Sequence, residues 1–269
     1  MRESRLPDLK NELLQFVKGF GVYDMRVADA SKGFKNAISG CRPKDVMENS
    51  NSVVVFATYV GLDYYRSLKI ENKTVGDDRI MNILCDWVQF KAAEFLLERG
   101  YRALLPTGYF NREKLIPRFS FKLAAYEAGI GVYGRCGIIV TPKYGPRVNL
   151  RAVLTDANLE PDGSLTDFNP CVKCRLCVEL CPPKAIRENV SPPGGHDRDK
   201  CINFILKLRE KTGDQRFYCG YCYNHCPVGK TRRPGFKLSR YKNLLDLDVK
   251  ERNRLINESI SELSVGGRT

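Results

Sequence analysis

Residues 171–182 read CVKCRLCVELCP, and residues 219–227 read CGYCYNHCP. The first stretch is C-x2-C-x2-C-x3-C-P, and the second ends in C-x2-C-x3-C-P, with Cys201 standing alone between them. Three thiolates on a tight loop can bind three corners of an iron–sulfur cubane, and this spacing is the ferredoxin type. The two stretches therefore predict two [4Fe–4S] clusters.

The two runs also predict which cysteines share a cluster. In two-cluster modules of this type, the fourth cysteine of a run binds the other cluster. Crossing the fourth cysteines gives each cluster four thiolates. The predicted ligands are Cys171, Cys174, Cys177 and Cys226 for cluster 1, and Cys181, Cys201, Cys219 and Cys222 for cluster 2. Two zinc sites of four cysteines are the alternative, but zinc more often uses paired C-x2-C knuckles, so the spacing favours iron.

Apart from Cys201, three of the eleven cysteines lie outside these runs: Cys41, Cys85 and Cys136. Cys85 falls in a predicted helix beside Leu84, so we expect it to be a buried core thiol. Cys136 follows Arg135, whose charge would lower the pKa of the thiol. Crowded cysteines in a long chain without a secretory signal indicate metal binding or catalysis rather than disulfides.

Composition excludes several classes of protein. The 269 residues include no apolar stretch of about 18 residues, so we expect no transmembrane helix. The N-terminal residues, MRESRLPDLKNELL, lack an apolar signal core, which predicts a cytoplasmic protein. Only two histidines are present, which argues against a multi-histidine metal centre. The net charge of +13 permits an anionic partner such as RNA or a phosphate-bearing cofactor.

The region before the cysteine runs alternates between helix and strand patterns. Apolar spacing and β-branched runs such as VVVFATYV indicate these elements. The predicted helices cover 6–18, 77–99 and 117–128, and the predicted strands cover 53–60, 101–106, 137–142 and 148–156. A hairpin around 143–147 would join the last two strands. In the long helix we expect the apolar side to be marked by Ile80, Ile83, Leu84, Trp87, Phe95 and Leu96. This order predicts an α/β or α+β sandwich domain over residues 1–165.

The composition changes at about residue 166. From 166 to 235 the chain is rich in cysteine, proline, glycine and basic residues, with a short helix predicted near 200–210. Metal–thiolate bonds can replace an apolar core, so these residues are expected to form a bacterial ferredoxin-like module with two [4Fe–4S] clusters. Residues 236–269 are expected to form a basic segment followed by a polar helix over 246–263.

Residues 124–156, AAYEAGIGVYGRCGIIVTPKYGPRVNLRAVLTD, resemble the AGLGWIGK…GS…LGEILTD segment of epoxyqueuosine reductases. These are cobalamin-dependent iron–sulfur enzymes of tRNA queuosine maturation, and related sequences occur in reductive dehalogenases. Residues 59–68, YVGLDYYRSL, are similar to the Y-x-x-G-x-D-Y-H segment of the same family. The order of the eight clustered cysteines also matches. The resemblance covers about residues 50–232.

The resemblance implies a base-off cobalamin held between the α/β domain and the cluster module. The clusters would reduce its cobalt, and the cobalamin would reduce a modified tRNA nucleoside or a small molecule. The implied cofactor-binding residues are Tyr59, Gly131, Tyr133, Gly134, Arg135, Cys136, Gly137 and Arg147. An external low-potential donor, a ferredoxin or flavodoxin, would supply electrons, and tRNA is an implied partner.

Asp63 and Tyr64 are the candidate catalytic residues. They follow a predicted strand, where α/β proteins often bind ligands, and either side chain could donate a proton. The register at which epoxyqueuosine reductases carry an acidic proton donor falls near Leu115 and Ile116, with Glu113 the nearest carboxylate. Two alternatives stay open: a two-cluster electron-transfer protein without cobalamin, and a reductase with another cofactor such as a flavin.

Overall fold

The computed structural model describes residues 6–59, 78–108, 110–111, 116–192, 194–212 and 219–229. All of these residues fall within one unit, Met1–Lys230. The residues on both sides of position 165 belong to this same unit. The domain boundary predicted there stays a prediction. No helix in the described ranges is long and apolar enough to cross a membrane.

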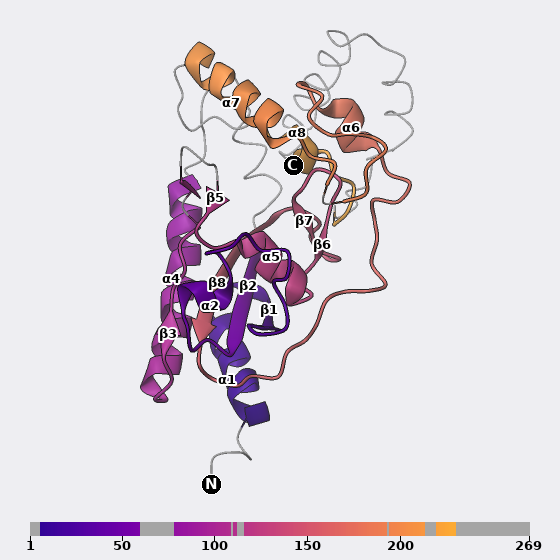
Figure 1. The fold of residues 1–269 in the computed structure, drawn as a ribbon. Helices are drawn as coiled ribbons and strands as arrows, with labels where there is room; N and C mark the ends of the chain where they lie inside the picture. The colour runs from indigo at the N-terminus through magenta and orange to yellow at the C-terminus, as the bar shows by residue number, and fades with distance from the viewer. Residues whose placement is uncertain are drawn as a thin grey trace, which may run out of the picture. The chain divides into compact units, whose positions relative to one another are not determined.

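A four-stranded antiparallel sheet lies at the centre of the fold (Figure 1). Its strand order is β1-β2-β8-β3. The strands are β1 (Val22–Asp29), β2 (Ser52–Tyr59), β8 (Val148–Thr155) and β3 (Ala103–Leu104). In the register, Val54 of β2 lies between Val27 of β1 and Val153 of β8. The β-branched run predicted as a buried strand therefore occupies an interior position in the sheet.

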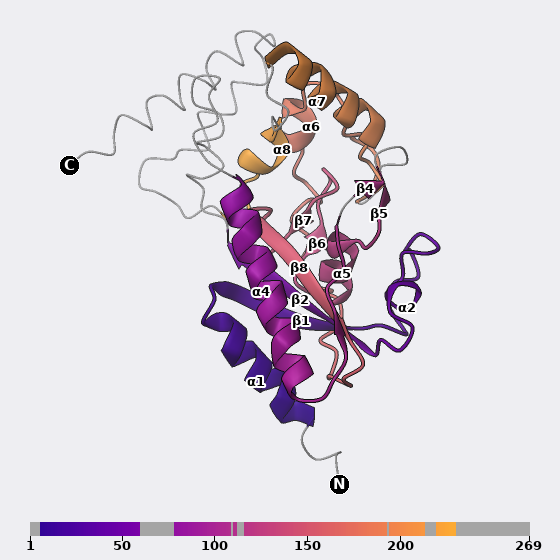
Figure 2. The same cartoon turned by 90° about the vertical axis from the view of Figure 1, so that its left-hand side faces the viewer.

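Helices cover both faces of this sheet. Successive side chains of β2 point to opposite faces, as the pleat requires. Val54 packs on the face covered by α1 (Leu6–Lys18) and α4 (Asp78–Glu98). Val55 packs on the other face, against α5 (Phe121–Glu127). Figure 2 shows α1 and α4 on one side of the strands and α5 on the other.

The helix α1 is held by a single apolar stripe. Leu9, Leu13 and Val17 recur every four residues and are all buried. This spacing places them on one face of the helix, which contacts the sheet and α4. The predicted helix over 6–18 is confirmed.

The helix α4 confirms the prediction over 77–99, but its buried side matches the expected apolar side only in part. Ile83, Leu84 and Trp87 are 63%, 51% and 51% exposed. Phe95 and Leu96 are buried as expected, and the rest of the buried side is formed largely by smaller side chains, Cys85, Val88, Ala92 and Ala93 among them. Small residues let the helix axis approach the sheet closely, so bulk and hydrophobicity did not decide which side faces inward. The prediction that Cys85 is a buried core thiol is confirmed.

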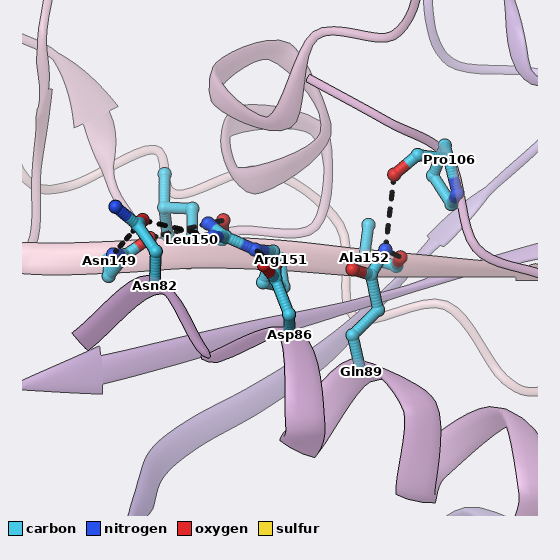
Figure 3. A network of polar contacts seen from close by, with 8 residues as sticks. All are labelled: Asn82, Asp86, Gln89, Pro106, Asn149, Leu150, Arg151 and Ala152. Atoms are coloured by element: carbon cyan, nitrogen blue, oxygen red, sulfur yellow. Dashed lines mark hydrogen bonds and ion pairs between the residues drawn. The ribbon is translucent and has the colours of Figure 1, made fainter. Parts of the chain in front are cut away.

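Polar side chains on α4 also bind β8 (Figure 3). Gln89 is buried, and its Nε2 donates to the Ala152 carbonyl at 2.7 Å and to the Pro106 carbonyl at 3.2 Å. Arg151 Nε donates to Asp86 Oδ1 at 2.6 Å. Because β3 pairs with only the last residues of β8, Gln89 serves a carbonyl of β8 that the short strand does not reach.

Two predicted elements differ from the structure. The helix expected from Pro117 begins at Phe121, because the Ser120 hydroxyl caps it by accepting from the Leu123 N–H at 3.2 Å. Pro117 instead lies in β5 (Ile116–Pro117), which pairs with β4 (Phe110–Asn111). The strand expected over 101–106 is only the two residues of β3.

The hairpin expected around residues 143–147 is also wrong. The strand β7 (Ile139–Val140) pairs with β6 (Val132–Tyr133), whereas β8 pairs with β2 and β3. Pairing of β8 with the largely buried β2 is favoured over pairing of β8 with β7, because the longer β2–β8 pairing buries far more apolar surface than a short hairpin would. Residues 132–140, which include Gly134 and Gly137, therefore form the β6–β7 hairpin.

Three helices accompany the cysteine runs. They are α6 (Leu176–Leu180), α7 (Arg198–Thr212) and α8 (Tyr221–Asn224). α6 packs against α8, and α7 confirms the short helix predicted near 200–210. The apolar core here is small, with Cys136, Cys181, Ala185 and Ile186 as its buried members. The helix predicted over 246–263 lies outside the described residues.

Candidate metal centre

Both cysteine runs converge on Cys136, in the turn between β6 and β7. Hydrogen bonds with Cys177 of the first run and with Cys222 of the second hold the pKa of this buried thiol well below its usual value, so the lowered pKa predicted for Cys136 has these neighbours, and not Arg135, as its main cause. Cys177 and Cys222 are also close enough to each other for their charges to interact. Cys181 and Cys201 pack in the same buried cluster. Thiols that are far apart in the sequence are therefore brought together at one place.

Contacts between thiols place Cys226 with the first run. Burial raises the pKa of Cys171, and the charges of Cys136 and Cys174 raise it further. A hydrogen bond to Cys136 raises the pKa of Cys177, and burial and the charges of Cys171 and Cys174 add to this effect. Burial raises the pKa of Cys226 to about 11, with the charges of Cys136 and Cys171 contributing. Cys226 is thus a neighbour of Cys171, which the crossed assignment places in the same ligand set.

The remaining thiols form a second group. Burial raises the pKa of Cys201, and the charges of Cys219 and Cys181 add to the shift. A hydrogen bond to Cys136 raises the pKa of Cys222, with burial and the charge of Cys219 contributing. These neighbours match the predicted ligands of cluster 2, whose occupancy by iron stays a prediction.

No three His, Cys, Asp or Glu side chains in the described ranges converge tightly enough to hold a single metal ion. A four-iron cubane makes a different demand, because each of its four thiolates binds a different iron atom. The thiols of a cluster site therefore surround a volume rather than a point.

Arg135 holds the first cysteine run by its backbone. The side chain is buried, and Nη2 donates to the Cys171 carbonyl at 2.9 Å. Nη1 donates to the carbonyls of Glu188 at 2.7 Å and Val190 at 3.3 Å. The guanidinium therefore joins the β6–β7 turn to two segments of the cysteine region.

Arg147 holds the second cysteine run by its backbone, as Arg135 holds the first. Its side chain is fully buried, and Nη1 donates to the carbonyls of Tyr223 at 3.2 Å and Cys226 at 3.1 Å. Nη2 donates to the Val228 carbonyl. Two positive charges thus lie beside a thiolate-rich site, where they would offset the negative charge of bound clusters.

Gly145 brings the chain around Arg147 against the loop after Cys226. A Cβ at Gly145 would lie 2.1 Å from the Val228 carbonyl oxygen, and the residue has φ +60°. Both the space and the backbone conformation require glycine at this position.

A cavity of about 820 Å³ lies beside the first cysteine run. It is lined by three of the predicted cofactor-binding residues, Tyr133, Arg135 and Gly137, and by Cys171 and Cys201, one thiol from each predicted ligand set. Its volume falls in the range of about 300–1,000 Å³ that is usual for ligand sites.

Basic side chains dominate the charge of this cavity. Lys122, Arg135, His196 and Arg198 line it, and no carboxylate does so within the described part of the chain. Burial lowers the pKa of Lys122, and the positive charge of Arg198 lowers it further. Burial and the charge of Lys122 lower the pKa of His196. Both groups release a proton more readily than their counterparts on a protein surface.

The other predicted cofactor-binding residues do not line the cavity. Tyr59 stacks on Tyr144 with ring centroids 4.2 Å apart. Gly131 lies against β7, where a Cβ would be 2.6 Å from the Val140 carbonyl oxygen. Gly134, Cys136 and Arg147 are likewise absent from its lining. Their role in binding a cofactor stays a prediction.

The chain is similar in sequence to several known proteins. No protein-family model matches the chain. It is 26% identical over 206 residues to epoxyqueuosine reductase of Staphylococcus aureus (strain NCTC 8325 / PS 47), which covers 74% of this chain and 46% of that protein. It is 34% identical over 123 residues to tetrachloroethene reductive dehalogenase of Sulfurospirillum multivorans, covering 39% of this chain and 23% of that protein. The chain is a homologue of the epoxyqueuosine reductases and the reductive dehalogenases.

Solved structures show the same fold. An epoxyqueuosine reductase crystallised with an epoxyqueuosine-modified tRNA-Tyr stem loop has a TM-score of 0.62 and 23% identity, covering 86% of this chain and 67% of that one. A reductive dehalogenase structure described as suggesting a mechanism for B12-dependent dehalogenation has a TM-score of 0.60 and 19% identity, covering 91% and 35%. The predicted resemblance is confirmed, and the fold is mixed α/β. The chain spans about half or less of the length of these two relatives by sequence.

Several residues singled out from this resemblance lie outside the described ranges. These are Asp63, Tyr64 and the 113–115 segment with its Glu113. Sequence reasoning missed Lys122 and His196, the two basic cavity residues with lowered pKa values. In the sequence, Lys122 is marked only as a charged residue inside a mostly apolar predicted helix. His196 is marked only by the scarcity of histidine in this chain.

Proposed function

We propose that this chain is an iron–sulfur oxidoreductase in which two [4Fe–4S] clusters pass electrons to a base-off cobalamin that reduces a substrate. The observation that carries the proposal is the meeting of both cysteine runs at Cys136, directly beside the cavity lined by Tyr133, Arg135 and Gly137. In this reading the cysteine region is a two-cluster ferredoxin-like module set against an α/β domain.

The residues present fit both groups. The eight thiols are partly or fully buried and have two groups of neighbours, and two buried guanidinium groups supply positive charge. Tyr133, Arg135 and Gly137 would border a corrinoid, with Lys122 and His196 available to its polar groups. When bound, the clusters supply one-electron transfer at low potential, and the cobalamin supplies a strongly reducing cobalt centre.

The chain's own residues would manage protons and water in the cavity. Burial raises the pKa of Tyr133 to about 12, so its hydroxyl stays protonated at neutral pH. Lys122, whose pKa is lowered, is the described cavity group best suited to release a proton to a reduced substrate. His196, whose pKa is lowered from its usual value near 6.5, is mostly neutral at pH 7. Leu123, Val132 and Phe168 supply apolar lining, which disfavours bulk water near the reacting atoms.

The substrate and partners are proposed on similarity. One structural relative was solved with a modified tRNA stem loop, and the net charge of +13 suits an anionic polymer. We therefore propose a modified tRNA nucleoside as one substrate class and a small molecule as the other. A low-potential ferredoxin or flavodoxin would supply the electrons, and the cytoplasm stays the predicted location.

The decisive test is anaerobic reconstitution followed by cofactor binding. We expect about eight iron atoms per chain, then one tightly bound cobalamin with a base-off cob(II)alamin EPR signal. Thr166→Trp should weaken this binding because Thr166 lines the cavity, whereas its neighbour Asp167→Trp should not. Both variants should keep their iron.

Each failure has a separate meaning. A chain that binds zinc and stays colourless would refute the cluster assignment. A chain with eight iron atoms that binds neither cobalamin nor its analogues would be a two-cluster electron-transfer protein or would use another cofactor. Tight binding of an epoxyqueuosine-modified stem loop over the unmodified loop would select tRNA as the substrate.

A further inference from the structure

The first cysteine run presents an apolar side chain to solvent between two predicted cluster ligands. Val172 lies between Cys171 and Cys174 in the sequence, and it is 63% exposed. Cys171 and Cys174 are themselves only half-buried. The crossed assignment places both cysteines in cluster 1. A molecule that docks on Val172 therefore comes close to two ligands of one cluster.

The backbone of this loop is held from its inner side. The buried Arg135 side chain donates through Nη2 to the carbonyl oxygens of Cys171 at 2.9 Å and Val172 at 3.5 Å. The Val172 carbonyl is thus tied to a buried group, while the Val172 side chain stays open to solvent. A surface that is held in place before a partner arrives loses little conformational freedom on binding, and this lowers the cost of docking.

The charged side chains next to Val172 are positive. Lys173 is exposed, and the Arg175 side chain is 56% exposed. Arg175 forms an ion pair with Glu188, and residues 168–178 contain no carboxylate side chain. A [4Fe–4S] cluster on four thiolates carries a net negative charge, which repels an anionic protein. Cations beside the ligands offset this repulsion at the surface.

A small apolar centre with a basic surround suits a transient redox partner. Electron-transfer encounters bury less than about 1,200 Å² in total, so a small patch is sufficient. Opposite charges around such a patch raise the rate of encounter more than they raise the affinity. Electron transfer slows steeply with distance, so a position beside the cluster ligands favours it.

We propose that Val172, Lys173 and Arg175 form the docking surface for an acidic, low-potential electron-transfer protein. A flavodoxin in its anionic hydroquinone state would give one electron to cluster 1 and become the neutral semiquinone. The cluster core would pass from 2+ to 1+, and no proton has to move. The inference rests on the proposed two-cluster function and deepens it by naming the surface through which electrons enter.

The test measures how fast a reduced flavodoxin of net negative charge reduces the clusters, by anaerobic stopped-flow absorbance. Lys173→Glu is compared with the wild type and with Lys18→Glu. Lys18 is also exposed, and it lies at the end of α1, which packs on the sheet and α4. Both variants change the net charge equally. We expect Lys173→Glu to slow reduction about five- to tenfold at low salt, and Lys18→Glu to slow it less than about twofold. The difference should shrink at high salt.

Val172→Ser tests the apolar part of the surface. It should raise the flavodoxin concentration at half-maximal rate about threefold at low and high salt alike, because salt does not screen apolar contacts. Val172 also lines the cavity, so the measurements omit cobalamin and substrate and report docking alone. Dithionite, which is small and needs no docking surface, should reduce every variant to the same extent. Every variant should keep about eight iron atoms.

The outcomes separate this inference from the proposed function. Wild-type protein that binds no iron would overturn both. Equal slowing in Lys173→Glu and Lys18→Glu, or no slowing in either, would overturn the docking surface and leave the two-cluster function intact. The surface would instead belong to RNA if Lys173→Glu weakened binding of a tRNA stem loop without slowing reduction. If Lys173→Glu loses iron, Lys173→Gln and Val172→Ser decide, and both must then slow reduction by flavodoxin.

Discussion

Arg135 and Arg147 act on cysteines that come from different runs but belong to one predicted ligand set. Arg135 Nη2 donates to the Cys171 carbonyl at 2.9 Å, and Arg147 Nη1 donates to the Cys226 carbonyl at 3.1 Å. Cys171 and Cys226 are both ligands of cluster 1 in the crossed assignment. In that assignment the two arginines hold the backbone of the same ligand set.

Replacing either arginine by methionine should remove that cluster and spare the other. Each change leaves buried carbonyls without a donor, at a cost of about 1–3 kcal/mol for each group. We expect iron to fall from about eight to about four atoms per chain in both variants, with the same EPR signal lost. If Arg135→Met and Arg147→Met removed different clusters, the uncrossed assignment would be correct.

Gln89 should contribute more to stability than the ion pair beside it. Gln89→Leu removes the donor from two carbonyls, those of Pro106 and Ala152, and should lower the free energy of unfolding by about 2–4 kcal/mol. Asp86→Asn weakens a pair in which the carboxylate is 61% exposed, so it should cost at most about 1 kcal/mol. Urea unfolding of the reconstituted protein measures both. Equal costs would show that the Gln89 carbonyls find other donors.

Gly145→Ala should disturb the second cysteine run. The added methyl carbon would lie 2.1 Å from the Val228 carbonyl oxygen, so the loop after Cys226 must move. Gly100→Ala is the matched control, because Gly100 also has positive φ, +81°, but has no atom within 4 Å of its Cβ position. We expect both variants to lose about 1 kcal/mol from backbone strain, and only Gly145→Ala to lose iron. Iron retained in Gly145→Ala would contradict the close approach.

Tyr23 should make the protein less stable in strong alkali. Burial raises its pKa to about 12, whereas an unfolded tyrosine titrates near 10. The folded state therefore holds the proton more tightly. This contribution is fully present below about pH 10 and is lost as the pH rises from about 10 to about 12. In Tyr23→Phe the free energy of unfolding should fall less steeply over this interval, measured by urea unfolding at each pH. An identical slope would show that Tyr23 is not buried as a neutral phenol.

The elements that were predicted well are those whose side chains repeat at a clear period. Leu9, Leu13 and Val17 mark α1, and the β-branched residues of β2 mark a buried strand. The strand β1 was missed because Asp24 and Arg26 interrupt its apolar pattern, although they form an ion pair with each other.

The site was predictable as a set of cysteines but not as an arrangement. The spacing of the two runs indicates iron, because each run repeats cysteines at the short intervals typical of ferredoxins. The partners of Cys136, Arg135 and Arg147 are distant in sequence, and many are backbone carbonyls, which leave no trace in residue type. The two glycines of the GRCG sequence around Cys136 are typical of a tight turn, but only the fold shows what lies opposite it.

The anchoring of the cysteine runs has a consequence for how freely this chain can change. Arg135 and Arg147 recognise main-chain oxygen atoms, so the identity of the side chains at Val172, Tyr223 or Val228 does not enter the contact. The intervening positions can therefore accumulate substitutions without loosening the attachment. A lineage could in this way reshape the surface of the cysteine region while the backbone that carries the cysteines stays in place.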